Sequence, residues 1–277
     1  MGIRFTKMHG LGNDFIVIDA SKSPAHLSAE QIQRLARRDI GIGFDQCLLL
    51  EKSPEPGIDF FYRIFNANGE EVGQCGNGAR CLARFIQRYQ LSPRLNLSVA
   101  TKTTRLQLQI NPDDSVTVDM GAPQFAPSHI PLLANTQQAL YEIPLPNEKS
   151  CAVHAVSIGN PHAILLVDNC LAMDIDPIGS AISKHPLFPE ETNVGFMQLC
   201  AKNHIQLRVF ERGCGETRAC GSGAVAAAIV GQRFHHLAQT VTVSLPGGDL
   251  FVHWSGQDGQ SVYLTGAATF VYEGQIL

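Results

Sequence analysis

The chain has 277 residues, of which 44% are hydrophobic and 17% charged, and its formal net charge is −4. This composition is typical of a soluble globular protein of about two domains, and it excludes the excess of basic residues found on nucleic-acid-binding surfaces. The apolar run 224–230 is far shorter than the roughly 20 residues of a membrane-spanning helix, and the N-terminus lacks the apolar core of a signal peptide. We expect a cytoplasmic protein that binds neither nucleic acid nor a membrane.

The eight cysteines predict reduced thiols, because the chain lacks the short cysteine framework of small secreted proteins. The pairs Cys75/Cys81 and Cys214/Cys220 are each separated by five residues, whereas zinc sites use two to four. The cysteine spacing therefore does not favour a zinc site. The other cysteines lie in apolar runs, where we expect small buried side chains. They are Cys47, Cys151, Cys170 and Cys200.

The first half of the chain predicts a sheet with two helices. Residues 9–14 are polar and glycine-rich and predict a loop between two strands. Ser28 and Gln31 form a capping box that predicts a helix to residue 38, and the apolar spacing in 79–90 predicts an amphipathic helix. The predicted strands are 3–8, 15–19, 47–51, 59–65, 95–99, 106–110 and 116–119.

The second half repeats this plan after a proline-rich, irregular stretch that begins near residue 120. Residues 157–162 lead into an apolar strand as the first glycine-rich loop does, and 224–230 is apolar all round, which indicates a helix buried on every side. Strands are predicted at 241–245 and 250–254. The fold class is α/β (α+β), with two pseudosymmetric domains that each curl a mixed sheet around a central helix.

A repeated segment supports this duplication. RIFNANGEEVGQCGNGARC (63–81) aligns without gaps with RVFERGCGETRACGSGAVA (208–226), and places Cys220 145 residues after Cys75. Asn13 and Gln46 have counterparts 147 residues later, in Asn160 and Asn193. A spacing this long exceeds the 20 to 50 residues of solenoid repeats and indicates duplication of a whole domain.

Each matched cysteine stands just before a predicted helix in a Gly-x-Gly context. The helix start supplies unpaired N–H groups and a partial positive charge, which favour a thiolate and can also bind a carboxylate. A lone cysteine of this kind could simply be a small buried residue. Two equivalent cysteines, Cys75 and Cys220, predict instead a pair that flanks one substrate carbon and moves a proton from one face to the other, as in a racemase or epimerase.

Two other functions fit less well. Residues 221–226 match the pattern of a dinucleotide-binding turn, but a polar loop precedes them where an apolar strand is required. A cysteine hydrolase would need one cysteine with a dedicated histidine; His162 could serve, but the second matched cysteine would have no role. No pattern for a phosphate-binding loop or a pyridoxal lysine is present, so we expect catalysis without a cofactor.

Six motifs together resemble the diaminopimelate epimerase family. They are MHGLGNDFIVID (8–19), GIGFDQ (41–46), CGNGARC (75–81), GNPH (159–162), NVGF (193–196) and ERGCGETRACGSGA (211–224). The resemblance covers essentially the whole chain. It implies cofactor-independent conversion of LL-2,6-diaminopimelate to the meso form, for lysine and peptidoglycan synthesis. It also implies domains of residues 1–119 plus 265–277 and of 120–264.

The resemblance also implies roles for individual residues. Cys75 and Cys220 would be the acid and base, assisted by His162 and Glu211. The implied substrate-binding residues, some of which supply backbone amides, are Asn13, Gln46, Asn66, Gly76, Asn77, Asn160, Asn193, Glu211, Arg212, Gly221 and Ser222. A racemase of another amino acid and a non-catalytic binding protein remain alternatives. The residues do not decide the oligomeric state, and a homodimer is one assembly compatible with them.

Overall fold

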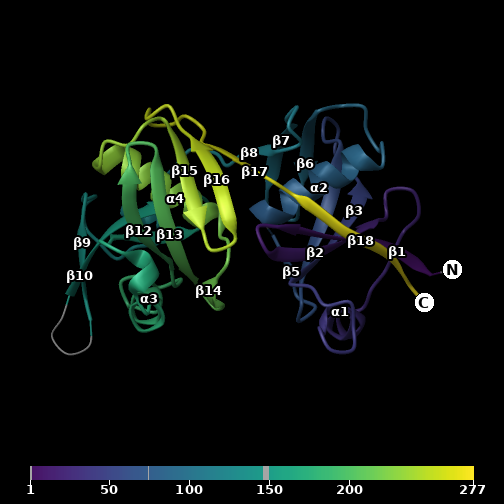
Figure 1. Ribbon diagram of the computed structural model, residues 1–277, viewed down its shortest axis with the longest axis horizontal. Helices are drawn as coiled ribbons and strands as arrows, with labels where there is room; N and C mark the ends of the chain where they lie inside the picture. Colours follow the sequence, from purple (N-terminus) through teal and green to yellow (C-terminus); the bar gives the residue numbers. More distant parts are fainter. Residues whose placement is uncertain (1, 74, 146–149) are drawn as a thin grey trace. The chain divides into compact units, whose positions relative to one another are not determined.

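A computed structural model describes residues 2–73, 75–145 and 150–277. The chain divides into two compact units, of which the first is Met1–Asp119 with Thr265–Leu277 and the second is Met120–Leu264 (Figure 1). Strand β17 (Tyr263–Gly266) carries the chain back into the first unit. In the described ranges, no helix is long and apolar enough to cross a membrane.

The first unit is a mixed sheet with two helices, α1 (Ala29–Ala36) and α2 (Gly76–Arg88). Its strands are β1 (Ile3–Gly10), β2 (Asn13–Asp19), β3 (Gln46–Lys52), β4 (Phe60–Asn66), β5 (Glu71–Val72), β6 (Asn96–Ala100), β7 (Arg105–Ile110), β8 (Val116–Asp119) and β18 (Thr269–Ile276). They pair in the order β18-β1-β2-β3-β4-β6-β7-β8, and β5 also pairs with β4. The pairs β2–β3 and β4–β6 are parallel, and the others are antiparallel.

The second unit contains helices α3 (Asp176–Ser183) and α4 (Gly221–Phe234) and the short 3₁₀ turns η1 (Pro127–His129) and η2 (Cys170–Ala172). Its strands are β9 (Tyr141–Pro144), β10 (Ser150–Ser157), β11 (Pro161–Leu166), β12 (Asn193–Ala201), β13 (His204–Glu211), β14 (Gly215–Thr217), β15 (Thr240–Leu245) and β16 (Gly248–His253). They pair in the order β9-β10-β11-β12-β13-β15-β16, and β14 also pairs with β13. Strands β10 to β16 repeat the order and directions of β1 to β7, so the sequence repeat is also a repeat of topology.

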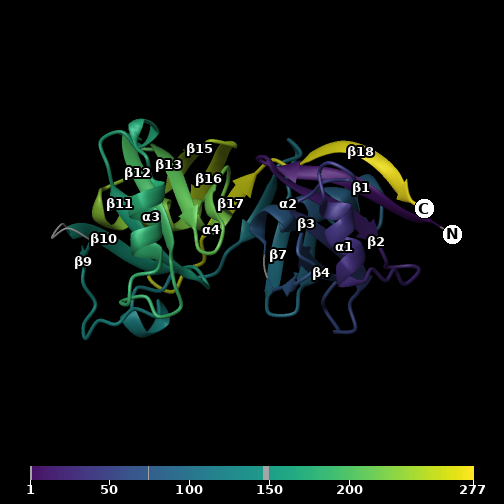
Figure 2. The ribbon, with the colours of Figure 1, turned by 90° about the horizontal axis from the view of Figure 1, so that it is seen from below.

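The central parallel pair of each unit explains its continuous apolar sequence. Strands β2 and β3 are buried on both faces, as are β11 and β12, and parallel strands covered on both sides lose the alternation of polar and apolar residues. One face of β2 and β3 packs with Ile32 of α1, and Figure 2 shows α1 beside these strands. The opposite face meets α2, where Gly78 lies close to the side chain of Leu48.

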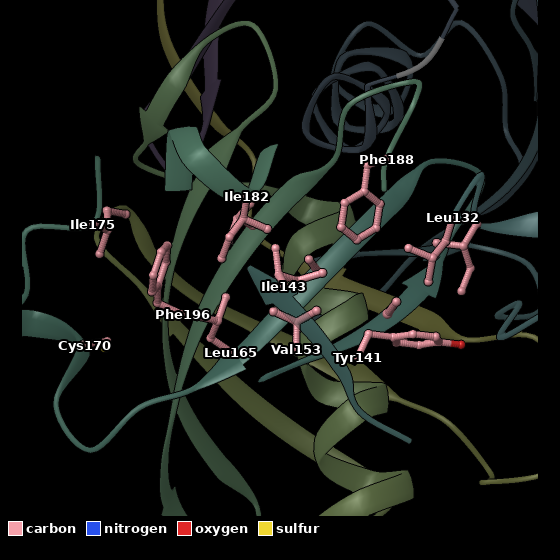
Figure 3. Close-up of a cluster of buried hydrophobic side chains, with 14 residues drawn as sticks. Leu132, Tyr141, Ile143, Val153, Leu165, Cys170, Ile175, Ile182, Phe188 and Phe196 are labelled. Atoms are coloured by element: carbon pink, nitrogen blue, oxygen red, sulfur yellow. The ribbon is translucent and has the colours of Figure 1, made fainter. Parts of the chain in front are cut away.

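The second unit has the same layers. Side chains from the strands, including Val153, Leu165 and Phe196, form a buried cluster with Ile182 of α3 (Figure 3). On the other face, α4 is buried from Gly223 through Gly231. This burial confirms the prediction of a helix enclosed on all sides, and the mixed sheet-dominated fold confirms the predicted fold class.

Some predicted boundaries were wrong. The loop expected at residues 9–14 is a tight hairpin, because β1 continues to Gly10 and β2 begins at Asn13. Only Leu11 and Gly12 form the turn, with φ of 55° and 87°, the left-handed pair that matches the twist of a hairpin. The capping box of Ser28 is present, but its helix ends at Ala36 rather than at residue 38.

Two cysteines also differ from expectation. Cys47 and Cys170 are buried as predicted, but Cys151 is only half-buried and Cys200 is exposed. Cys200 lies near the end of β12, where the strand runs out of the core, and its apolar neighbours in sequence include the exposed Leu199. An apolar run therefore does not ensure burial at the end of a strand.

Candidate active site

Cys75 is the N-cap residue of α2. Its backbone is extended, with φ of −155°, and the Gly78 N–H donates a hydrogen bond of 3.4 Å to its sulfur. The helix starts directly at Gly76, three residues earlier than the apolar spacing predicts. The sulfur thus lies at the end of the helix that carries unpaired N–H groups and partial positive charge.

Two asparagines of the predicted site lie beside Cys75. Asn13 Oδ1 is 3.9 Å from the sulfur and accepts a hydrogen bond of 3.2 Å from Asn77 Nδ2. Asn13 Nδ2 donates in turn to Asp45 Oδ2 at 2.9 Å. The tight β1–β2 hairpin therefore places an amide against the start of α2, where it joins the cysteine to an acidic residue.

The carboxylates behind Asn13 belong to a charged network that the sequence interpretation missed. Arg38 donates to Asp14 at 2.8 and 3.0 Å and to Asp45 at 2.8 Å, and Lys7 donates to Asp14 at 2.5 Å. Burial alone would raise the pKa of Asp14, but the hydrogen bonds from Arg38 and Lys7 lower it to about 2. The two acids and two bases balance one another, so this network adds little net charge to the site.

Gln46 and Asn66 form a second amide pair in the first unit. They are direct partners across β3 and β4, and Gln46 Nε2 donates to Asn66 Oδ1 at 2.8 Å. In the part of the chain that the structure describes, the buried Gln46 Oε1 has no hydrogen-bond partner. This acceptor is available to an N–H group of a ligand.

Cys220 is the N-cap residue of α4, with only 4% of its surface exposed. Its S–H donates to Glu211 Oε2 at 3.2 Å, and its sulfur lies 3.7 Å from Ser222 Oγ. The other carboxylate oxygen of Glu211 accepts 2.5 Å from Thr217 Oγ1. Thr217 was missed because nothing in its sequence position distinguishes it from a turn residue.

The expectation that this environment favours a thiolate was wrong for Cys220. Burial raises the pKa of the Cys220 thiol well above its ordinary value, and the neighbouring Glu211 carboxylate raises it further. The hydrogen bonds from the Gly223 backbone and from Ser222 act in the opposite direction but are outweighed. Burial and the Glu211 carboxylate therefore both favour the protonated form of Cys220, whose S–H is directed at Glu211.

Asn160 and His162 lie at the edge of this second site. Asn160 Nδ2 donates to Ser222 Oγ at 3.4 Å, and Asn160 Oδ1 is 3.1 Å from His162 Nε2. His162 is fully buried, and its Nδ1 has no partner among the residues described. Burial, with a smaller effect from Arg212, lowers the pKa of His162 to about 3, so the imidazole is neutral at physiological pH.

Asn193 and Arg212 form the last predicted group. Asn193 is the register partner of His162 in the parallel pair β11–β12, and its Nδ2 donates 3.2 Å to the Pro161 oxygen. Asn193 Oδ1 accepts from the Arg212 backbone N–H at 3.2 Å. The exposed Arg212 side chain donates to the Glu190 oxygen at 2.8 Å, which leaves other N–H groups of its fork for a ligand.

The two half-sites have equivalent backbones but different chemistry. Asn66 occupies the position 145 residues before Glu211, and Phe15 the position 147 residues before His162. The first unit thus has an amide and a phenyl ring where the second has a carboxylate and an imidazole. Duplication kept the cysteine at the helix start and changed the side chains that set its ionisation.

Two glycines show where the half-sites are open and where they are closed. A Cβ built on Gly76 would meet no atom within 4 Å, so the first amides of α2 face open space. A Cβ on Gly223 would lie 3.1 Å from a methyl of Val209 and 3.2 Å from the Cys220 sulfur. Gly76 therefore allows a ligand to approach the helix start, whereas Gly223 makes room for the thiol.

The buried His162 predicts an acid-sensitive fold. The unfolded chain protonates this histidine near its ordinary pKa of 6.5, whereas the folded chain does so only at about 3. Its contribution to stability is therefore complete above pH 6.5 and is lost as the pH falls towards 3. His162→Phe places here the side chain that its counterpart Phe15 has in the first unit. When the pH falls from 7.5 to 5, the free energy of unfolding of this variant should decrease by about 2 kcal/mol less than that of the unchanged protein.

Urea unfolding at the two pH values measures this difference. The matched control is His129→Phe, which replaces an exposed histidine. Its free energy of unfolding should decrease between the two pH values by the same amount as that of the unchanged protein. An equal loss in His162→Phe and the unchanged protein would show that His162 titrates normally when folded.

Comparison with known proteins agrees with the motifs. Diaminopimelate epimerase, as a family, matches residues 5–126 and 154–271. A diaminopimelate epimerase of Legionella pneumophila (strain Corby) is 57% identical over 277 residues, which is 100% of both chains. One of Pseudomonas aeruginosa (strain LESB58) is 48% identical over 276 residues, covering 100% of this chain and 99% of that one.

Solved structures of lower identity share the fold. A PhzF-family phenazine biosynthesis protein of Bacillus anthracis aligns with a TM-score of 0.69 at 18% identity, covering 100% of this chain and 99% of the other. A probable proline racemase of Agrobacterium radiobacter K84 aligns with a TM-score of 0.68 at 15% identity, covering 99% and 93%. These two show the fold alone. The family match and the full-length identities show that the chain belongs to the diaminopimelate epimerase family.

Proposed function

We propose that this protein interconverts LL- and meso-2,6-diaminopimelate without a cofactor, and thereby serves lysine and peptidoglycan synthesis in the cytoplasm. The observation that carries this proposal is a helix-capping cysteine in each unit of a chain that is 57% identical, over its full length, to a diaminopimelate epimerase.

The reaction assigned to the two thiols is a proton exchange at one α-carbon. A thiolate takes the α-proton, so that an S–H bond forms and the C–H electron pair moves into the substrate carboxylate. The other thiol then gives its proton to the opposite face, which leaves the new C–H bond inverted and the thiolate on the other cysteine. Glu211, which already accepts the Cys220 S–H at 3.2 Å, and the neutral His162 are the groups that we propose assist this exchange.

The α-carboxylate must be stabilised as charge develops on it. We assign this role to the backbone amides of Gly76 and Asn77 and of Gly221 and Ser222, because the first N–H groups of a helix bind anions. The open space above Gly76 supports this assignment. Preorganised donors of this kind supply a large part of the stabilisation of a carbanionic transition state.

The other end of the substrate carries a second amino group and carboxylate. We assign its recognition to Asn66, Asn193 and Arg212, with Asn13, Gln46 and Asn160 completing the set of amides. Arg212→Ala should remove a charge-assisted hydrogen bond worth about 1.5 to 3 kcal/mol, and should therefore raise KM by roughly 10- to 150-fold. Steady-state kinetics with LL-diaminopimelate measures this effect, and an unchanged KM would place the distal carboxylate elsewhere.

Solvent deuterium incorporation tests the function directly. The purified protein is incubated with LL-diaminopimelate in D₂O, and the α-carbon is examined for deuterium and for the meso product. Proton exchange through thiols requires deuterium in the product. Absence of deuterium would favour a binding protein, and exchange of proline or glutamate in its place would favour another racemase.

We also propose a homodimer as the assembly in solution. Sedimentation equilibrium decides this point, since the dimer has twice the chain mass of 30.1 kDa. A single species of chain mass at micromolar concentration would contradict it.

A further inference from the structure

Arg80 is a fully buried cation within α2, and the proposed function gives it no role. Its Nη2 donates to Asn77 Oδ1 at 2.9 Å, and its Nε donates to the Ala267 oxygen at 3.4 Å. The buried Nη1 has no hydrogen-bond partner among the described residues. Nor does any carboxylate in the described ranges form an ion pair with it. A buried charge without a counter-charge is costly, so its presence requires an explanation.

The guanidinium sets the orientation of two amides in the Cys75 half-site. Arginine has only N–H donors, so Asn77 must turn its oxygen towards Arg80 and its NH₂ group towards Asn13. Asn13 must then turn its oxygen towards Asn77 and Cys75, and its NH₂ towards Asp45. The chain from Arg80 to Asp45 therefore has one direction, and it places Asn13 Oδ1 3.9 Å from the sulfur as an acceptor for the Cys75 S–H.

Strand β1 packs closely against Arg80. A Cβ on Gly10 would lie 3.3 Å from Arg80 Nη2 and 3.4 Å from the Asn77 Cβ, so β1 passes directly over the guanidinium. The glycine is the residue that permits this close approach. The contact with Ala267 ties the other side of the guanidinium to the chain segment before β18.

Among the thiols near this charge, Cys75 is the one able to balance it. The ionised forms of Cys81 and Cys75 would both interact favourably with Arg80. Burial raises the pKa of Cys81 to about 12, despite the opposing effect of Arg80, so Cys81 remains a thiol. Cys75 is less buried and receives the Gly78 N–H.

The second unit has no equivalent cation. Val225 occupies the position 145 residues after Arg80 and is fully buried in α4. Beside Cys220 stands the carboxylate of Glu211, 3.2 Å from the sulfur. A carboxylate holds a thiol proton far more strongly than the neutral oxygen of Asn13 does at 3.9 Å. The charged group of the first half-site thus favours the thiolate of Cys75, whereas the charged group of the second favours the protonated thiol of Cys220.

We propose that Arg80 is the positioning residue of the Cys75 half-site. It fixes the amides of Asn77 and Asn13, and its charge favours loss of the proton from Cys75 before loss of the proton from Cys220. This inference rests on the proposed function for its catalytic meaning, but its ionisation can be measured without substrate.

The other titratable groups on the elements that pack around the start of α2 do not supply this charge. They are Cys81 on α2, Tyr62 on β4, Lys7 and His9 on β1, Asp14 on β2, and Asp45 and Arg38 beside it. Lys7, Asp14, Asp45 and Arg38 neutralise one another, and burial raises the pKa of Tyr62 above its ordinary range. Of the cations in this set, Arg80 is the one that is always charged and that forms no ion pair with a carboxylate of the described residues.

Alkylation by iodoacetamide between pH 5 and 9.5 tests the assignment in the full chain. Peptide mass spectrometry measures the alkylation of Cys75 and of Cys220 separately at each pH. The midpoints of the two pH profiles are compared, rather than the rates, because the rates also depend on how exposed each thiol is. The midpoint of Cys75 should lie below that of Cys220. A lower midpoint for Cys220 would overturn the proposal in the unchanged protein, without any variant.

Three variants isolate the part played by Arg80. Arg80→Gln removes the charge but keeps N–H donors, and should raise the Cys75 midpoint by about one pH unit, which is about tenfold slower alkylation at a fixed lower pH. Arg80→Lys keeps the charge but cannot hold both Asn77 and Ala267, so it should keep the midpoint while kcat falls about tenfold. Arg84→Met removes a charge one turn further along α2, paired with Asp114, and should leave the midpoint unchanged.

Each outcome decides the proposal. A folded Arg80→Gln protein whose Cys75 midpoint stays within about 0.3 pH units of the unchanged protein would show that the charge has no effect. If Arg80→Gln does not fold, Arg80→Lys decides, and an unchanged kcat would rule out positioning. A shifted midpoint together with no deuterium exchange in the unchanged protein would leave Arg80 as assigned and refute the proposed function instead.

Discussion

Replacement of either Cys75 or Cys220 by alanine is expected to abolish epimerisation while the protein stays folded. A two-base exchange loses its acid or its base with each substitution, and one such group is worth about 10² to 10⁴ in rate. Because inversion needs both groups in sequence, each single variant should fall below detection. Conversion of LL- to meso-diaminopimelate, followed by chiral separation, measures the loss.

Two control variants, Cys75→Ser and Cys47→Ala, separate catalysis from folding. Cys75→Ser keeps an oxygen that can accept the Gly78 N–H and cap α2, so it should be as stable as the unchanged protein and still inactive. Cys220→Ala replaces one small buried side chain by another, so this variant should also stay folded. Cys47→Ala should remain active, since burial raises the pKa of this thiol to about 12 and keeps it out of proton transfer. Activity in Cys75→Ser would contradict a thiol mechanism.

The central elements of the fold could be predicted because they depend on local sequence. The runs FIVI (15–18) and CLLL (47–50) are apolar throughout, as strands buried on both faces must be, and 224–230 is apolar on every side because α4 lies between strands. Because the two halves are repeats, each element predicted in one half also supported its counterpart in the other half. In these segments the sequence pattern is compatible with one kind of element and one state of burial.

Other elements depend on partners distant in sequence. Strand β18 pairs with β1 at the other end of the chain and is exposed along much of its length, so no apolar alternation marks it. Strands β5 and β14 have only two and three residues and exist because a neighbouring strand pairs with them. Helix α3 lacks a side-chain cap, and its interior glycine, Gly179, fits against Phe210, a contact invisible in sequence.

The candidate site was predictable in its residues and less so in its charges. The position of both cysteines at a helix start follows from the Gly-x-Gly pattern, and the family motifs name their neighbours. The ionisation of Cys220 depends on Glu211, nine residues earlier, which reaches it through the β13–β14 hairpin. Arg80 looks like a surface residue in a helix of mixed composition, and only the packed structure shows that it is buried.

Mild oxidation is expected to inactivate the protein through a Cys75–Cys220 disulfide. If both thiols act on one α-carbon, each sulfur must come within roughly 3 to 3.5 Å of it, so the two sulfurs also come close to each other. A two-electron oxidant such as diamide takes two electrons and two protons from the pair, and is itself reduced to the hydrazine. The bond removes acid and base together, so activity should fall to zero and return with dithiothreitol.

The structure makes this test sharper than the sequence does. Cys200 and Cys214 are exposed, so an oxidant can reach them and they would form disulfides between molecules. A Cys200→Ser, Cys214→Ser background removes this competing reaction and should keep full activity. In that background, peptide mapping of the oxidised protein should find Cys75 joined to Cys220. Loss of activity with both cysteines still reduced, or a bridge between any other pair, would contradict the placement of two thiols at one carbon, and with it the two-base reaction.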